Sequence, residues 1–133
     1  MLVVDASVLA VALVDHGPDG DAARGRLDGQ WLAAPEIADL EVTSVLRGLE
    51  RAGRLGPRHA ELALADLADL PLRRAPHAPL LPRCWELRHN LTPYDAAYVA
   101  LAELLGATLL TGDGRLARSN GPRCDVEVLA PSA

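Results

Sequence analysis

The chain has 133 residues, of which 50% are hydrophobic and only 3% aromatic, and its formal net charge is −5. This length fits a single domain, residues 1–133, and a core of Leu, Val and Ala disfavours a β-sandwich built on aromatic side chains. The negative charge disfavours passive binding to nucleic acid, although it is compatible with a nuclease whose carboxylates hold cations.

The first half of the chain predicts short strands separated by helices. In chain order these are a strand at 2–5, a helix at 6–14, a less regular helix at 20–27, a strand at 31–35 and helices at 38–53 and 56–70. The helix that begins at Ala38 has a predicted apolar face of Ala38, Val42, Val45, Leu46 and Leu49. Gly53 ends this helix, and Pro57 occupies a favoured early position in the next.

The second half continues the same alternation. The predicted elements are a weak strand at 72–76, helices at 80–90 and 92–105, a strand at 107–111, a short helical stretch at 115–120 and a strand at 126–129. Short apolar strands separated by helices are typical of a parallel sheet with helices on both faces. The sequence therefore predicts an α/β fold.

Four carboxylates stand at junctions between these elements, and each has an ordinary structural explanation. Asp5 follows a strand and precedes a helix, so it suits an N-cap, and Glu41 is expected in the first turn of its helix. Asp95 follows Thr92 by three residues, which resembles a capping box. Asp113 lies in the turn-forming sequence TGDG. Taken singly, each acid is explained by caps and turns.

Taken together, the four acids suggest a shared site. In a parallel α/β sheet, the carboxyl ends of the strands and the helices that begin there face one edge, where ligands bind. Two unit charges 4 Å apart repel by about 4 kcal/mol at an effective dielectric constant near 20, so clustered carboxylates need protons or cations. Oxygen ligands of this kind suit Mg²⁺ or Mn²⁺. We therefore expect the acids to cap helices and also to hold metal.

The segments VVDASVL, LEVTSVLRGLERAG, LTPYDAAYVALAE and LLTGDGRL resemble, in this order, PIN-domain ribonucleases and in particular the VapC toxins of toxin–antitoxin pairs. The resemblance covers nearly the whole chain. It implies a three-layer α/β/α PIN-like domain with a short-stranded, mostly parallel central sheet. It also implies an endoribonuclease that depends on Mg²⁺ or Mn²⁺, with either one or two ions.

The resemblance assigns roles to individual residues. It makes Asp5, Asp95, Asp113 and Glu41 the catalytic metal ligands, with Glu41 bound directly or through water. Ser7 and Thr111 would support this site. Some relatives carry a further acid shortly after the last one, whereas Arg115 stands there in this chain. The resemblance also implies an RNA substrate, a homodimer and a small antitoxin that inserts into the acidic groove.

Three other residues are candidate RNA contacts. Arg115 and Arg118 follow Asp113 closely, and Tyr94 precedes Asp95 and is suited to stacking on a base. Exposed arginine is also common without any such role. Tyr98 lies in an apolar run and is expected in the core.

The remaining chemistry is limited. Cys84 and Cys124 lack zinc-site spacing, and Cys84 is expected to be a buried free thiol. No Ser/His or Cys/His arrangement indicates nucleophilic catalysis, and no export signal is evident, so a cytoplasmic protein is expected.

Two other functions are compatible with these patterns. One is a non-catalytic PIN-like module whose acidic groove holds a basic peptide. The other is a phosphohydrolase acting on DNA or small molecules.

Overall fold

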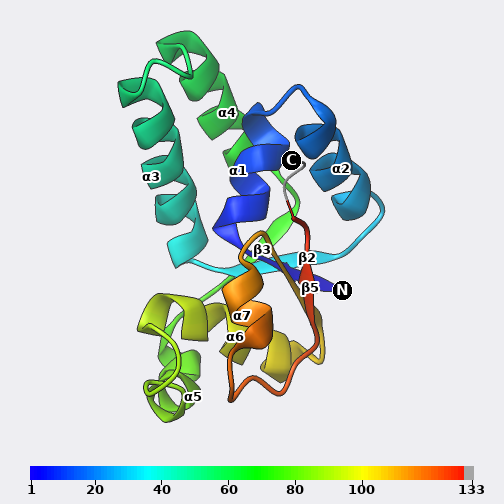
Figure 1. The fold of residues 1–133 in the computed structure, drawn as a ribbon, viewed down its shortest axis with the longest axis vertical. Coiled ribbons are helices and arrows are strands. Elements are labelled where there is room, and N and C mark those ends of the chain that lie inside the picture. Colours follow the sequence, from blue (N-terminus) through cyan, green and yellow to red (C-terminus); the bar gives the residue numbers. More distant parts are fainter. Residues whose placement is uncertain (131–133) are drawn as a thin grey trace.

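The computed structural model describes residues 1–130. A five-stranded sheet runs through the middle of the molecule (Figure 1). Its strands are β1 (Leu2–Val4), β2 (Leu32–Pro35), β3 (Leu72–Ala75), β4 (Thr108–Thr111) and β5 (Val126–Val128). The spatial order is β3-β2-β1-β4-β5, and all four pairings are parallel. The order of the chain reverses between β1 and β4, which makes their carboxyl ends the topological switch point.

Helices cover both faces of this sheet, which gives the predicted three layers (Figure 1). One face carries α1 (Ala6–Val14), α2 (Pro18–Leu27), α3 (Ile37–Arg51) and α4 (Pro57–Asp69). The other carries the short 3₁₀ helix η1 (Ala78–Leu80), α5 (Leu81–Glu86) and α6 (Pro93–Leu105), while α7 (Gly114–Arg118) packs near β5. Within residues 1–130, no helix has the length and apolar character needed to cross a membrane.

The core is aliphatic, as the composition predicts, and α6 lies at its centre. Seven consecutive residues of α6, from Ala96 to Ala102, are buried, and the helix contacts β1, β2 and β4. A helix that is apolar on all sides must be enclosed, and its four alanines allow the strands to approach closely. Because α6 immediately precedes β4 and runs against it, the first turn of α6 lies at the carboxyl edge of the sheet.

The predicted order of strands and helices is confirmed, with three local corrections. Helix α2 begins at Pro18, two residues earlier than predicted. The helix predicted at 80–90 is wrong in length: α5 ends at Glu86, and tight turns follow, in which Arg88 and Asn90 donate backbone hydrogen bonds to residues three positions earlier. On α3, Val45 was predicted to face the core but is 40% exposed, because the buried stripe follows Ala38, Val42 and Leu46 at a spacing of four.

Candidate functional site

Asp5 stands at the switch point, directly after β1. The register places Val4 beside Leu110 of β4, and the backbone N–H of Asp5 donates to the Leu110 carbonyl at 2.9 Å, which extends the strand pairing by one residue. Asp5 is therefore held against the end of β4, two residues before Asp113. The structure brings these two acids to the same edge of the sheet, as the parallel fold predicts.

Two hydroxyl groups orient the Asp5 carboxylate. Thr111 Oγ1 and Ser7 Oγ both donate to Asp5 Oδ2, at 2.7 Å and 3.0 Å. Although Asp5 occupies the N-cap position of α1, its side chain makes no capping hydrogen bond. The capping explanation is thus wrong for this carboxylate. Its orientation instead depends on Ser7 and Thr111, the two residues to which the resemblance assigns a supporting role.

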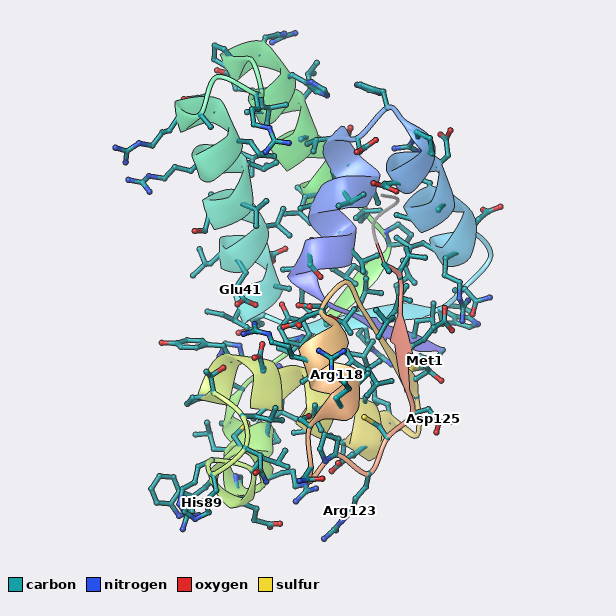
Figure 2. All side chains as sticks on the ribbon, viewed as in Figure 1. Met1, Glu41, His89, Arg118, Arg123 and Asp125 are labelled. Carbon is teal, nitrogen blue, oxygen red and sulfur yellow. The ribbon has the colours of Figure 1, made fainter. Side chains whose placement is uncertain are left out.

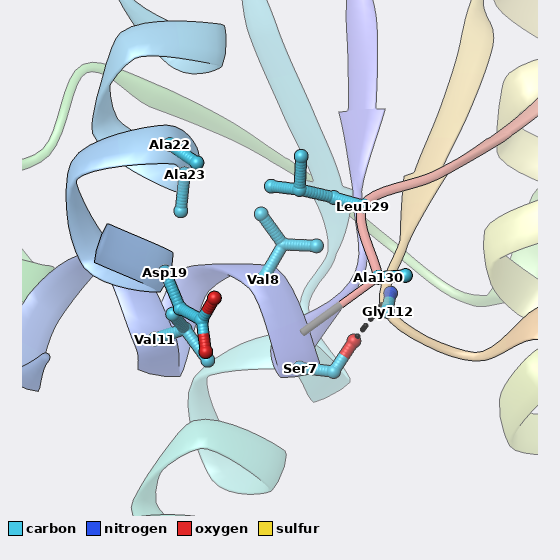
Figure 3. Close-up of a pocket in the computed structure, with 9 residues that line it drawn as sticks. All are labelled: Ser7, Val8, Val11, Asp19, Ala22, Ala23, Gly112, Leu129 and Ala130. Atoms are coloured by element: carbon cyan, nitrogen blue, oxygen red, sulfur yellow. Dashed lines mark hydrogen bonds between the residues drawn. The ribbon is translucent and has the colours of Figure 1, made fainter. Parts of the chain in front are cut away.

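The Ser7 hydroxyl is itself held by the loop after β4. Gly112 donates its backbone N–H to Ser7 Oγ at 3.1 Å (Figure 3). A Cβ atom at Gly112 would stand 3.2 Å from that oxygen, so the close approach favours glycine. Beyond this bond lies a cavity of about 210 Å³, lined mostly by apolar residues of α1 and α2 and by Leu129 and Ala130.

Asp95 reaches the same edge from the first turn of α6. Thr92 caps this helix, since its Oγ1 accepts a hydrogen bond from the Asp95 backbone N–H at 3.2 Å, and Pro93 follows at the first helical position. Burial raises the pKa of the Asp95 carboxyl, and the negative charges of Asp5 and Asp113 raise it further. Asp95 is therefore within electrostatic range of both strand-ending acids.

Glu41 joins the cluster from the other helical layer. The expectation that it lies in the first turn of its helix is wrong, because α3 begins at Ile37 and the acid of its first turn is Asp39. Glu41 is half-buried near the N-terminal end of α3 (Figure 2). Burial raises the pKa of its carboxyl, a hydrogen bond from Tyr98 lowers it, and the charges of Asp5 and Asp95 raise it. The charge of Asp5 thus acts on both Glu41 and Asp95, and the charge of Asp95 acts on Glu41.

The sequence did not reveal the partner of Glu41. The Tyr98 hydroxyl donates to Glu41 Oε1 at 2.6 Å. Tyr98 is 1% exposed, so its prediction as a core residue is confirmed. The one available signal was its spacing of three residues from Asp95, which puts both side chains on one face of α6.

The Asp113 carboxylate, unlike those of Asp5 and Glu41, is bound by an arginine. It caps α7 by accepting the Arg115 backbone N–H at 2.9 Å, so the structural explanation holds for this acid. The Arg115 guanidinium also binds it, with Nε 3.2 Å from Oδ1 and Nη2 3.0 Å from Oδ2. These hydrogen bonds from Arg115 lower the pKa of the Asp113 carboxyl. The Arg115 side chain is 84% exposed, so this pair adds little to stability and can open easily.

These acids fit a hard divalent cation by their chemistry, although their side chains are not arranged as a closed metal site. In the described part of the chain, no three His, Cys, Asp or Glu side chains are placed to hold an ion as they stand. Asp113 is turned to Arg115, and Glu41 is bonded to Tyr98. A cation would relieve the repulsion that raises the pKa of Asp95 and Glu41, and carboxylate oxygens are the ligands that Mg²⁺ and Mn²⁺ prefer.

A cleft of about 290 Å³ adjoins two of the acids. Its lining includes Asp95, Asp113, Arg115 and the helix-capping Thr92, together with residues to which the sequence analysis gave no role, namely Asn90, Leu91, Leu116 and Ser119. Arg118 is exposed on α7 (Figure 2), and its charge contributes to lowering the pKa of Asp113. Arg115 and Arg118 therefore border the acids.

Tyr94 lies apart from this cleft. Its side chain is 60% exposed and lines a different, apolar cavity of about 160 Å³ with Ile37, His77 and Leu81. Cys84 lines the same cavity, and its prediction as a buried free thiol is confirmed.

Known proteins are similar to this chain over nearly its whole length. The PIN domain family matches residues 2–121. Ribonuclease VapC1 of Mycobacterium tuberculosis (strain H37Rv) is 41% identical over 128 residues, which are 96% of each chain. Ribonuclease VapC9 of the same strain is 40% identical over 129 residues, which cover 97% of this chain and 98% of the relative.

Two solved structures share the fold at lower sequence identity. Mycobacterium tuberculosis VapC20, described as a Sarcin-Ricin loop cleaving toxin, has a TM-score of 0.68 and 21% identity, covering 89% of this chain and 94% of its own. VapBC2 from Rickettsia felis, solved with a DNA fragment from its promoter, has a TM-score of 0.69 and 16% identity, covering 96% and 97%. The fold, the full-length matches and the identity near 40% lead to one conclusion: this chain belongs to the VapC ribonucleases of the PIN-domain family.

Proposed function

We propose that this protein is an endoribonuclease, the toxin of a toxin–antitoxin pair, and that it hydrolyses RNA phosphodiesters with Mg²⁺ or Mn²⁺. The observation that carries the proposal is that Asp5, Glu41 and Asp95 come to one sheet edge, where the charge of Asp5 raises the pKa of both other carboxyls and the charge of Asp95 raises that of Glu41. This convergence occurs in a chain 41% identical to a protein named Ribonuclease VapC1. Carboxylates that only capped helices would not need to repel one another.

Each residue of the edge has a role in this proposal. Asp5, Asp95 and Asp113 hold the cation, and Glu41 binds it directly or through water. Ser7 and Thr111 keep the Asp5 carboxylate in one orientation, since both donate to the same oxygen. A bound divalent cation supplies Lewis-acid stabilisation and lowers the pKa of coordinated water.

Arg115 and Arg118 supply positive charge beside the acids. If Asp113 held the cation, its bonds to Arg115 would open, and the exposed Arg115 guanidinium would be free to bind an RNA phosphate. Tyr94 is exposed and suited to stacking on a base, and it lies beside the apolar cavity and not in the acidic cleft. We therefore assign to Tyr94 a contact with RNA that extends beyond the cleft.

Two protein partners complete the proposal. Solved complexes of similar chains, VapBC2 from Rickettsia felis and a toxin–antitoxin complex from Klebsiella pneumoniae, support a cognate antitoxin as a partner. In our proposal this antitoxin inserts into the acidic groove. A homodimer is supported by exposed apolar side chains of α3 and α5, namely Leu40, Leu81 and Trp85. Of these residues, Leu81 also lines the apolar cavity that includes Ile37, and exposed apolar side chains favour burial against a second copy. Its substrate and partners would place the protein in the cytoplasm.

One observation favours the alternative of a non-catalytic module. The groove already accepts a guanidinium group, that of Arg115 on Asp113, so it can bind a basic peptide without any chemistry. Such a module would bind the peptide equally well with or without a divalent cation, and it would leave RNA intact.

The test is cleavage of labelled single-stranded and structured RNA by purified, antitoxin-free protein with Mn²⁺, with Mg²⁺ and with EDTA. Matched DNA and a phosphate monoester serve as competing substrates. We expect cleavage of RNA only, lost in EDTA and in Asp95→Asn. Intact RNA under every condition with folded protein would favour the peptide-binding module, whereas cleavage of DNA or the monoester would favour a broader phosphohydrolase.

A further inference from the structure

The phenol of Tyr98 connects the two helical layers at the site. It extends from α6, one turn after Asp95, and donates a 2.6 Å hydrogen bond to Glu41 Oε1 on α3. The ring is buried, with 1% of the residue exposed, so its position is fixed by packing. The helix that carries Asp95 is therefore tied through this hydroxyl to the helix that carries Glu41.

The segment that carries Asp5 also influences this phenol. Burial and the bond to Glu41 raise the pKa of the Tyr98 phenol far above its ordinary value, whereas a backbone hydrogen bond with Ala6 lowers it. Ala6 is the first residue of α1 and follows Asp5 directly. The phenol thus remains a neutral donor at any working pH, and it lies among three chain segments that each bear a candidate ligand.

A purely structural role explains this arrangement less well. A buried phenol needs a hydrogen-bond partner, and a neutral carbonyl group would be sufficient. Glu41 is a costly acceptor for that purpose alone, because its carboxylate is half-buried and must give up part of its hydration. The bond uses one lone pair of Oε1 and leaves Oε2 for an ion or its water.

We propose that Tyr98 is a positioning residue that holds the Glu41 carboxylate in the orientation needed to bind the divalent cation. This inference rests on the proposed function, in which Glu41 contributes to the metal site. Without the phenol, the Glu41 side chain would move among rotamers on a partly exposed helix face, and each binding event would have to order it again. Tyr98 itself does not touch the ion or the RNA.

The test is the Tyr98→Phe variant, which removes one oxygen atom and retains the ring. Isothermal titration of antitoxin-free protein with Mn²⁺ measures metal affinity without reference to activity. We expect the Kd for Mn²⁺ to rise about tenfold, the lower end of what loss of a ligand's supporting partner costs. The KM for RNA at saturating Mn²⁺ should stay unchanged. The matched control is Val99→Ala, a buried neighbour on α6, which should lower the melting temperature and leave the Mn²⁺ affinity unchanged.

A double-mutant cycle shows whether Tyr98 acts through Glu41. In a Glu41→Ala background, Tyr98→Phe should weaken Mn²⁺ binding no further. An unchanged Mn²⁺ affinity in Tyr98→Phe, or an equal further loss in the Glu41→Ala background, would overturn the inference while wild-type cleavage of RNA left the proposed function standing. Wild-type protein that neither binds Mn²⁺ nor cleaves RNA would instead overturn the proposed function itself.

Discussion

The two ends of α6 place carboxylates in opposite electrostatic surroundings. At the end near the carboxyl edge, Asp95 is surrounded by other acids, and its pKa is raised by burial and then by Asp5 and Asp113. At the other end, Glu103 accepts hydrogen bonds from Arg83 Nε at 2.7 Å and from the Arg123 backbone N–H at 2.7 Å. Burial raises the pKa of Glu103, but these hydrogen bonds outweigh it and lower the pKa overall.

This contrast distinguishes an acid that holds the fold together from the acids to which we assign a cation. Arg83 and Glu103 are 19% and 15% exposed, so their pair is partly shielded from water and anchors α5 against α6. No comparably shielded arginine serves Asp5, Glu41 or Asp95 in the described part of the chain, and Arg115 reaches Asp113 only from solvent. A cation would therefore stabilise the end of α6 that carries Asp95, where the acids repel one another.

The largest expected effect comes from removing the charge of Asp95, at the end of α6 where the acids repel one another. Asp95→Asn should lower the rate of RNA cleavage by more than about 100-fold, since losing a ligand should cost at least as much as losing a ligand's supporting partner. Its melting temperature in EDTA should equal or exceed that of the wild type, because the substitution removes repulsion. Cleavage assays and calorimetry measure the two effects. An Asp95→Asn variant that is less stable but still cleaves RNA would show that Asp95 serves the fold and not the cation.

Removing a support of Asp5 should have a smaller effect of the same kind. Thr111→Val takes away the hydroxyl that donates to Asp5 at 2.7 Å and accepts from the Asp113 backbone N–H at 3.0 Å. We expect a loss of about 10- to 100-fold in metal-dependent cleavage, with partial recovery at high Mn²⁺ concentration. Thr111→Ser retains the hydroxyl and is the matched control. Equal rates for the valine and serine variants would show that the hydroxyl does not matter.

A substitution at the other end of α6, where Glu103 pairs with Arg83, should lower stability and leave the rate of RNA cleavage unchanged. Glu103→Gln should reduce the free energy of unfolding by about 1.5–3 kcal/mol, the range for hydrogen bonds to charged groups. Cleavage at low temperature should remain at the wild-type rate, because Glu103 lies at the far end of α6. Chemical denaturation and a cleavage assay check this pair of expectations. A loss of cleavage without a loss of stability would contradict it.

The same pair predicts a pH dependence. Because the pKa of Glu103 is lower in the folded protein than in the unfolded chain, its contribution to stability is complete above the unfolded value of about 4.3. That contribution is lost as the pH falls through the lower, folded pKa. The difference in unfolding free energy between wild type and Glu103→Gln should therefore be constant near neutrality and shrink below about pH 4. A difference that grows on acidification would contradict the assignment.

The smallest expected effect on the fold comes from Arg115→Ala. The side chain is exposed, so the melting temperature should not change measurably. If Arg115 leaves Asp113 for an RNA phosphate, the KM for RNA should rise severalfold while kcat changes little. Arg47→Ala, an exposed arginine on α3, is the control for a general loss of positive charge. An equal rise in KM for both variants would assign no specific contact to Arg115.

Much of this fold follows from local sequence signals. Pro57, Pro93 and Gly106 mark helix ends, and short apolar runs mark β1, β2 and β4, so most of the element order was predictable. The parallel arrangement then places Asp5 and Asp113 at one edge without further information. Burial on α3 was harder to predict, because Val42 and Val45 both fit an apolar face and only packing distinguishes them.

The finer contacts of the site depend on tertiary geometry. Local pattern places Tyr98 in the core, but it cannot show that the hydroxyl emerges beside Glu41, 57 residues away in the chain. Likewise, Arg115 is merely an arginine after a turn until the α7 cap brings its guanidinium onto Asp113. The sequence identifies these polar groups but does not show which of them bond to each other. Hydrogen-bond partners are therefore harder to predict than helices and strands.

We propose that the acids of the carboxyl edge form one cation site. A crystal structure of the antitoxin-free protein soaked in Mn²⁺, with the ion located by its anomalous scattering, would test this proposal. We expect an anomalous peak at the switch point, with oxygens of Asp5 and Asp95 about 2.0–2.2 Å from it, as in hard-cation sites. We also expect Asp113 to have turned from Arg115 toward the ion. A saturated crystal with no peak at this edge, or with a peak held by other residues, would show that these acids do not form the site.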